Sequence, residues 1–208
     1  MASLPPLEGS YVTGLKLIDE AHAQDPTRTP FPDGSAQDVP YELHYAQKMT
    51  RFLALRSPDA SPALQLACRA QHFRRWELPR SSYPMTRVGY LTWRAKQKSQ
   101  AAAQVKELLA SLDPPIPEAD LDRIAALINK QNLATNEETQ ALEDVACLVF
   151  LDDQFDDFEK KTADDDEKII NILRKTWGKM SPKGRDLALQ MQHSERALSL
   201  IGRALAGA

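Results

Sequence analysis

The chain has 208 residues, of which 42% are hydrophobic and 26% are charged, and this length and composition predict one globular domain of ordinary size. Its net charge at pH 7 is −3. The longest apolar run, residues 145–151, is shorter than the roughly 20 residues that cross a bilayer, and the first ten residues lack the features of a secretory signal, so we expect no membrane association and a cytoplasmic location. Cys68 and Cys147 lie apart in apolar patterns, which is typical of reduced core thiols.

The first half of the chain predicts helices separated by proline-rich loops. Apolar spacing predicts a short helix around residues 12–18, followed by turns at 25–34. The next helix begins after Pro40 and ends before Ser57. A further helix runs from Pro62 to about Glu77, with Asp59 or Ser61 as its cap, and a loop over 78–84 ends it.

Helical patterns continue to the C-terminus. They cover residues 86–111, 118–130, 136–155, 164–179 and 182–205, and prolines at 114, 115 and 117 interrupt them. No strand alternation extends beyond a few residues. The sequence therefore predicts an all-α fold without a sheet, a single-domain bundle of seven or eight helices over residues 1–208, with residues 1–40 partly irregular.

The charges are unevenly distributed along the chain. Residues 69–98 carry a net charge of +7 and the remainder carries −10, while residues 137–167 hold thirteen acidic side chains against two lysines. Aromatic residues alternate with the basic ones, as in a site for a phosphorylated or anionic ligand. The alternative is that the basic and acidic stretches pair with each other inside the protein. The candidate ligand-binding residues are Arg75, Trp76, Arg80, Tyr83, Arg87, Tyr90, Trp93, Arg94 and Lys175.

Two histidines and two adjacent carboxylates are candidates for chemistry. In a helix over 62–77, His72 shares the apolar face with Arg75, and His44 has Tyr45 beside it, whereas His22 and His193 are predicted at the surface. Either inward histidine can instead be a core residue bonded to a backbone carbonyl. Glu143 and Asp144 enter an apolar helix, so at least one needs a partner, either a metal or one of Arg75, Arg80 and Arg94.

The order of His44, His72 and Asp144 resembles the HD-domain superfamily of helical metal-dependent phosphohydrolases. The resemblance implies that these three residues bind one divalent ion, with Zn, Mn or Fe all compatible with imidazole and carboxylate ligands. Phe73 stands where that superfamily has an aspartate, and this departure puts the metal in doubt. HD-like scaffolds also host iron oxygenases, although four histidines are few for a diiron centre.

A second resemblance covers nearly the whole chain. The blocks at residues 69–76, 79–84, 87–94, 142–151 and 174–181 resemble a fungal and bacterial family known only as a domain of unknown function, number forty-two hundred and two. Some members carry the label glutamyl-tRNA synthetase. This sequence has no nucleotide-binding glycine motif, so we expect no nucleotide cofactor.

These patterns predict an enzyme, a metal-dependent hydrolase acting on a phosphorylated or otherwise anionic small molecule. Glu143 and Arg75 are the candidate catalytic residues, and a metal ion would activate water. One alternative is a metal-free module that binds an anionic metabolite or nucleic acid through residues 69–98, although the net charge disfavours nucleic acid. Another is a helical protein that binds a protein partner.

Overall fold

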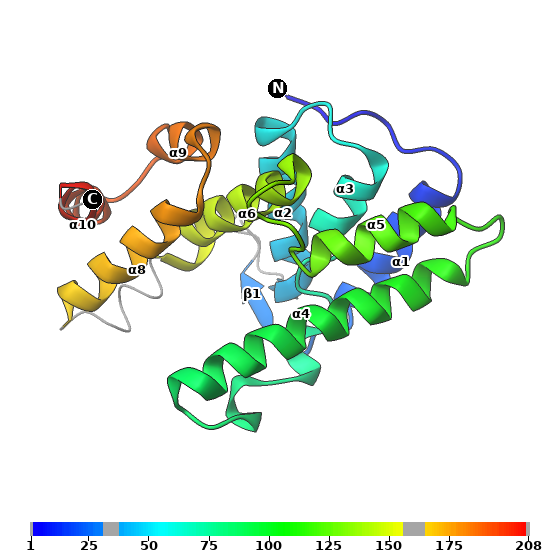
Figure 1. Ribbon diagram of the computed structural model, residues 1–208, viewed down its shortest axis with the longest axis horizontal. Coiled ribbons are helices and arrows are strands. Elements are labelled where there is room, and N and C mark those ends of the chain that lie inside the picture. Colours follow the sequence, from blue (N-terminus) through cyan, green and yellow to red (C-terminus); the bar gives the residue numbers. More distant parts are fainter. Residues whose placement is uncertain (1, 31–37, 156–164, 207–208) are drawn as a thin grey trace.

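The computed structural model describes residues 2–30, 38–155 and 165–206 and shows an all-α single domain (Figure 1). The predicted turns at 31–34 and the part of the acidic stretch at 156–164 lie outside the described residues. Within the described part, none of the helices has the length and apolarity that a bilayer span requires. The all-α prediction is confirmed.

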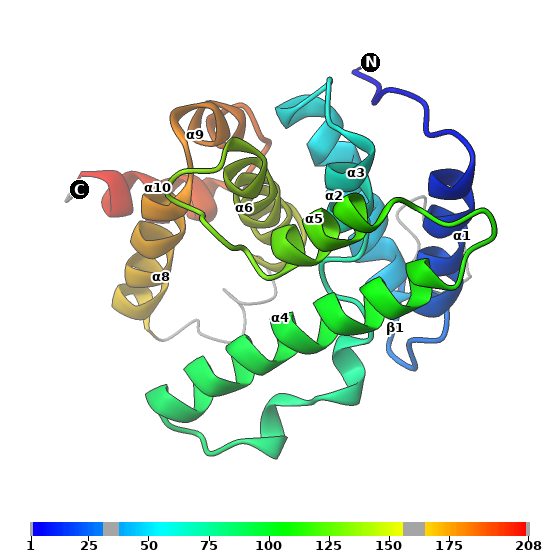
Figure 2. The ribbon, with the colours of Figure 1, turned by 45° about the vertical axis from the view of Figure 1, so that its right-hand side comes forward.

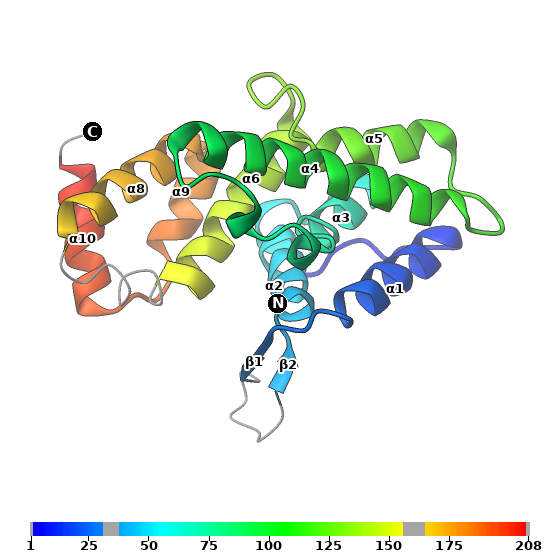
Figure 3. The same ribbon diagram turned by 90° about the horizontal axis from the view of Figure 1, so that it is seen from below.

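The N-terminal half contains three helices and one hairpin, in the order α1 (Ser10–His22), β1 (Arg28–Pro30), β2 (Asp38–Pro40), α2 (Tyr41–Arg56) and α3 (Pro62–Arg69). Helix α2 has the predicted limits, and Ser61 caps α3 by accepting a hydrogen bond from the Leu64 amide. The strands pair antiparallel, with Thr29 opposite Val39, and project away from the helices (Figure 3). The expectation of no sheet is therefore wrong at this hairpin, whose three-residue strands are too short to show alternation.

The C-terminal half consists of helices and one π-helical turn. Its elements are α4 (Arg87–Ala110), α5 (Glu118–Ile128), α6 (Glu137–Val149), the π-helical turn η3 (Phe150–Gln154), α8 (Asp166–Lys179), α9 (Pro182–Leu189) and α10 (Glu195–Leu205). The long α4 packs along α5, while α6 packs on α2 in the centre of the molecule (Figure 2). The helices enclose one core that includes Ile18, Met49, Leu53, Leu66, Val105, Ile124, Leu142 and Leu148.

Helix α3 ends earlier than the sequence predicts. The chain leaves the helix at Arg69, and residues 70–74 form turns before the short 3-10 turn η1 (Arg75–Glu77). His22 is fully buried, not on the surface as predicted, and its Nε2 donates to the Arg69 carbonyl oxygen at 3.0 Å. The helical spacing that placed His72 and Trp76 on one helix face therefore does not apply, although His72 still lies in the interior.

Two other predicted helices are divided. The stretch 182–205 forms α9 and α10, because Ser194 begins a new helix by accepting from the Ala197 amide. The predicted helix over 136–155 changes from α6 to the π-helical turn at Phe150. The described residues consequently contain nine α-helices, more than the seven or eight expected.

Candidate functional site

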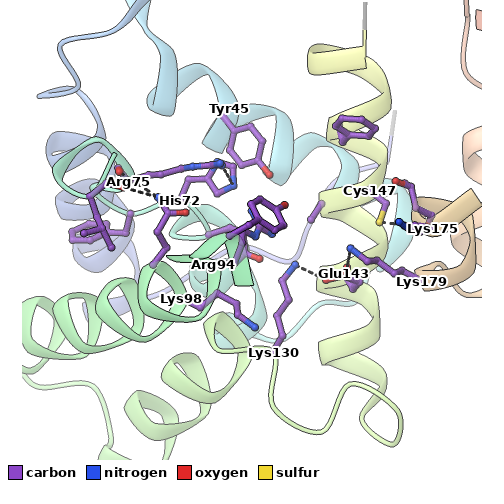
Figure 4. Close-up of a pocket in the computed structure, with 18 of the residues that line it drawn as sticks. Tyr45, His72, Arg75, Arg94, Lys98, Lys130, Glu143, Cys147, Lys175 and Lys179 are labelled. Atoms are coloured by element: carbon purple, nitrogen blue, oxygen red, sulfur yellow. Dashed lines mark hydrogen bonds and ion pairs between the residues drawn. The ribbon is translucent and has the colours of Figure 1, made fainter. Parts of the chain in front are cut away.

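A cavity of about 810 Å³ lies between α4, α6, α8 and the turns that follow α3 (Figure 4). Helix α4 contributes Tyr90, Arg94 and Lys98, which recur every four residues and so occupy one face. Helices α6 and α8 form the opposite wall with Glu143 and Lys175 among others. Four segments that are distant in sequence therefore meet around one space.

Cationic side chains dominate the lining of this cavity. They are Arg74, Arg75, Arg94, Lys98, Lys130, Lys175 and Lys179, against a single carboxylate among the described lining residues, Glu143. Within the described ranges, no carboxylate lies within ion-pair distance of Arg75, Arg94, Lys98 or Lys175. Burial lowers the pKa of Lys98, and the nearby charges of Lys130 and Arg94 lower it further. The cavity thus carries positive charge that the described residues do not neutralise.

The one lining carboxylate binds two of the lysines. Lys130 donates a hydrogen bond to Glu143 Oε2, and Lys179 Nζ lies 3.8 Å from Oε1. Burial alone would raise the pKa of Glu143, but the charge and hydrogen bond of Lys130, together with Lys179, hold that pKa below its ordinary value. Glu143 is therefore ionised at neutral pH and fixes the positions of two cationic side chains.

His72 lies on the inner wall of the cavity, in contact with three neighbours. Arg75 Nη1 lies 2.9 Å from Nε2, Glu42 Oε2 lies 3.3 Å from Nδ1, and the Tyr45 ring stacks on the imidazole with centroids 4.0 Å apart. Burial and the adjacent Arg75 lower the pKa of His72 well below its ordinary value. Arg75 Nη1 also lies 3.3 Å from Nδ1, and because Arg75 can only donate, the neutral imidazole accepts from it.

Glu42 is buried behind His72, and burial raises the pKa of its carboxyl group to about 8, although Arg75 opposes this shift. Glu42 and His72 are therefore both largely neutral at pH 7. The His72 imidazole is thus an uncharged polar group in the lining, next to the charged Arg75.

The backbone is strained at two lining residues. Arg74 has a φ of 47° and Lys130 a φ of 57°, both in the left-handed region that disfavours residues with a side chain. Such conformations cost of order 1 kcal/mol or more and concentrate at functional sites. At Lys130 this backbone conformation ends α5, because the Lys130 amide donates to the Leu127 carbonyl and the Gln131 amide to the Ala126 carbonyl.

The structure places the predicted ligand-binding residues in two groups. Arg75, Tyr90, Arg94 and Lys175 line the cavity, as do the candidate catalytic residues Arg75 and Glu143. The others do not line it, and these are Trp76, Arg80, Tyr83, Arg87 and Trp93.

Arg80 and Trp93 have local structural contacts. Arg80 donates to the backbone carbonyls of Tyr83 and Pro84, and Trp93 Nε1 donates to the Leu78 carbonyl at 2.9 Å. These bonds fold the loop before α4 against that helix. Both residues therefore stabilise the loop that packs on α4, and α4 lines the cavity.

The three predicted metal ligands are not brought together. His44 Nε2 lies 3.2 Å from Asp153, and His72 contacts Arg75 and Glu42. Asp144 is fully buried, and its oxygens accept from Arg56 Nε at 2.6 Å, the Ser181 amide and hydroxyl, and Gln140. In the part of the chain that the structure describes, no three histidine, cysteine or acidic side chains are grouped to hold a metal. These residues do not fit one metal centre.

The lining residues that the sequence did not single out include Gln71, Arg74, Lys98, Lys130 and Lys179. Lys98 follows Arg94 by one helical turn, which is a signal that helix periodicity contains. Lys130 and Lys179 lie at the ends of α5 and α8, where cations commonly interact with the helix dipole, so their position alone does not indicate a ligand site.

Comparison with known proteins identifies the family. The model described as "Domain of unknown function (DUF4202)" matches residues 13–201. The chain belongs to this family. The match includes every lining residue of the cavity, so the cavity lies within the family's domain. No curated protein and no solved structure matches the chain, and the resemblance to HD domains stays a prediction.

Proposed function

We propose that the chain binds a phosphorylated small molecule in the basic cavity and that this binding needs no metal ion. The observation that carries the proposal is the set of lining cations without carboxylate partners among the described residues, Arg75, Arg94, Lys98 and Lys175. Like charges gathered in a partly buried space repel one another, and an anion between them removes that repulsion. A bound anion would therefore stabilise the arrangement.

The kinds of cation favour phosphate as the anionic group. Arginine offers a planar fork that binds two phosphate oxygens, and lysine supplies a compact charge for a third. The volume of about 810 Å³ is within the range of small-molecule pockets, about 300–1,000 Å³. The overall net charge of −3 is unfavourable for a long nucleic acid, whose phosphates extend beyond any one cavity.

Hydrolysis of the bound molecule stays a prediction. The HD resemblance implied a metal ion at His44, His72 and Asp144, and those side chains have separate partners. Arg75 and Glu143, the candidate catalytic residues, instead support binding, Arg75 as a cation on the inner wall and Glu143 by positioning Lys130 and Lys179.

The proposal is tested by isothermal titration calorimetry with pyrophosphate in buffer containing EDTA. Lys98→Gln removes a half-buried cation from the cavity. We expect the affinity of this variant for pyrophosphate to be about tenfold lower than that of the wild type, because a charge-assisted hydrogen bond is lost. Lys96→Gln is the matched control, because Lys96 lies on the same helix but is exposed and does not line the cavity. Absence of binding by the wild-type protein, or equal loss in both variants, would contradict the proposal.

A further inference from the structure

Gln71 is a lining residue of the cavity whose covered side-chain amide has no partner. The residue is 8% exposed, it lines the cavity, and neither its Nε2 nor its Oε1 has a hydrogen-bond partner among the described residues. Buried polar groups in native proteins nearly always have partners, and leaving one without a partner costs free energy. An amide whose nitrogen and oxygen are both unpaired therefore indicates a group that forms its hydrogen bonds with a ligand bound in the cavity.

Three other glutamines in the described part of the chain have a partner for the side-chain amide. Gln65 Nε2 donates to the Ala60 carbonyl, Gln97 Nε2 to the Leu78 carbonyl, and Gln140 Nε2 to Asp144. Gln104 Oε1 is also buried without a partner, but Gln104 Nε2 donates to Glu77 and the residue does not line the cavity. Within the described residues, Gln71 thus combines two unpaired amide ends with a place on the cavity wall.

Apolar and aromatic side chains also line the cavity. They include Phe73, Leu78 and Tyr90, and the stacked rings of Tyr45 and His72, which lie within 10° of each other. Arg74 and Arg75 lie among them, so cations and uncharged groups share this part of the lining. The cavity has room for more than a phosphate, and the uncharged lining residues fit the uncharged part of a ligand.

We propose that the phosphorylated ligand is a nucleotide whose base pairs with the side-chain amide of Gln71 and lies among the aromatic lining residues. A primary amide places a hydrogen-bond donor next to an acceptor, and the edges of nucleobases carry the complementary acceptor and donor. Glutamine binds adenine in proteins through such a pair of hydrogen bonds. Bases also stack on aromatic side chains. The phosphate would lie against Arg94, Lys98 and the other cations.

This inference rests on the proposed function, and its test separates the two. Calorimetry compares pyrophosphate, ribose 5-phosphate and the monophosphates of adenosine, guanosine, cytidine and uridine. We expect at least one nucleoside monophosphate to bind about tenfold or more tightly than ribose 5-phosphate. If pyrophosphate does not bind, the proposed function fails; if it binds but no nucleotide exceeds ribose 5-phosphate, the nucleotide inference alone is overturned.

The role of Gln71 is tested by Gln71→Leu, which keeps the size of the side chain and removes the amide. We expect the nucleotide's advantage over ribose 5-phosphate to fall to about threefold or less. Gln104→Leu is the control, because it removes the other unpartnered buried amide oxygen at a place outside the cavity. Circular dichroism confirms that each variant folds. Retention of the full nucleotide advantage in Gln71→Leu would overturn the assignment.

Discussion

At the scale of single residues, burial decides which groups carry charge. Glu42 and Glu143 are both nearly covered, yet the pKa of Glu42 is raised to about 8 and that of Glu143 is lowered. The difference lies in their partners, because Glu143 has Lys130 and Lys179 beside it while Glu42 faces a neutral imidazole. The sequence contains both glutamates but does not show these partners, which come from other segments.

The raised pKa of Glu42 predicts a specific pH dependence of stability. The unfolded glutamate ionises near pH 4.5 while the folded one keeps its proton to about pH 8, so wild-type stability falls as pH rises through this window. Glu42→Gln lacks this loss. We compare the free energy of unfolding of the variant minus that of the wild type at each pH. We expect this difference to be larger at pH 8 than at pH 5 by up to a few kcal/mol, since one pKa unit corresponds to about 1.4 kcal/mol.

Urea denaturation of both proteins at pH 5 and pH 8 provides the measurement. Taking the difference between variant and wild type cancels the contributions of His22 and of other groups that titrate in the same range, except for coupling to His72. Glu20→Gln, at an exposed position of α1, is the control and should give the same difference at both pH values. A pH-independent effect of Glu42→Gln would show that Glu42 is ionised in the folded protein.

At the scale of elements, Asp144 joins three helices. Its carboxylate on α6 binds Arg56 at the end of α2 and the amide and hydroxyl of Ser181, which caps α9. A Cβ at Gly184 would lie 2.7 Å from the Asp144 side chain, so the first turn of α9 packs directly on it. The sequence predicted a partner for this carboxylate but not Arg56, because the convergence of α2 and α6 is a property of the whole fold.

We predict that Asp144→Ala lowers the free energy of unfolding by about 3–5 kcal/mol, because it removes the fully buried carboxylate and leaves the largely covered Arg56 without its charged partner. Chemical denaturation measures this loss, with Asp186→Ala on the exposed side of α9 as the control. EDTA should leave wild-type stability unchanged. A loss of stability in EDTA that matches the effect of Asp144→Ala would instead support Asp144 as a metal ligand.

Helix limits show how far local patterns reach. Helix α2 agrees with prediction because Pro40 and the residues before Pro58 provide local start and stop signals. The end of α3 has no such signal, since Arg69 is held by Asp19 and His22 of α1. Positions 70–77 therefore look helical in the sequence, and the turns that carry Gln71, His72 and Arg75 to the cavity could not be predicted.

At the scale of the whole molecule, the basic segment at 69–98 is only one part of the site. It supplies Arg74, Arg75, Arg94 and Lys98, while the remaining cations come from the ends of α5 and from α8. Among the described residues, no ion pair joins the basic stretch 69–98 to the acidic stretch 137–167. Glu143 binds Lys130 and Lys179, and Arg69 binds Asp19, so the alternative that the two stretches pair inside the protein finds no support there. The all-α class followed from helical periodicity, whereas the meeting of four segments required the fold.

The central claim, that this cavity holds the phosphate of a small molecule, is tested most directly by crystallography with tungstate as a heavy-atom substitute for phosphate. The anomalous signal of tungsten locates the anion without reference to any reaction. We predict a strong peak inside the cavity, in contact with Arg94 and Lys98 of α4. Tungstate peaks confined to the outer surface, with none in the cavity, would contradict the account.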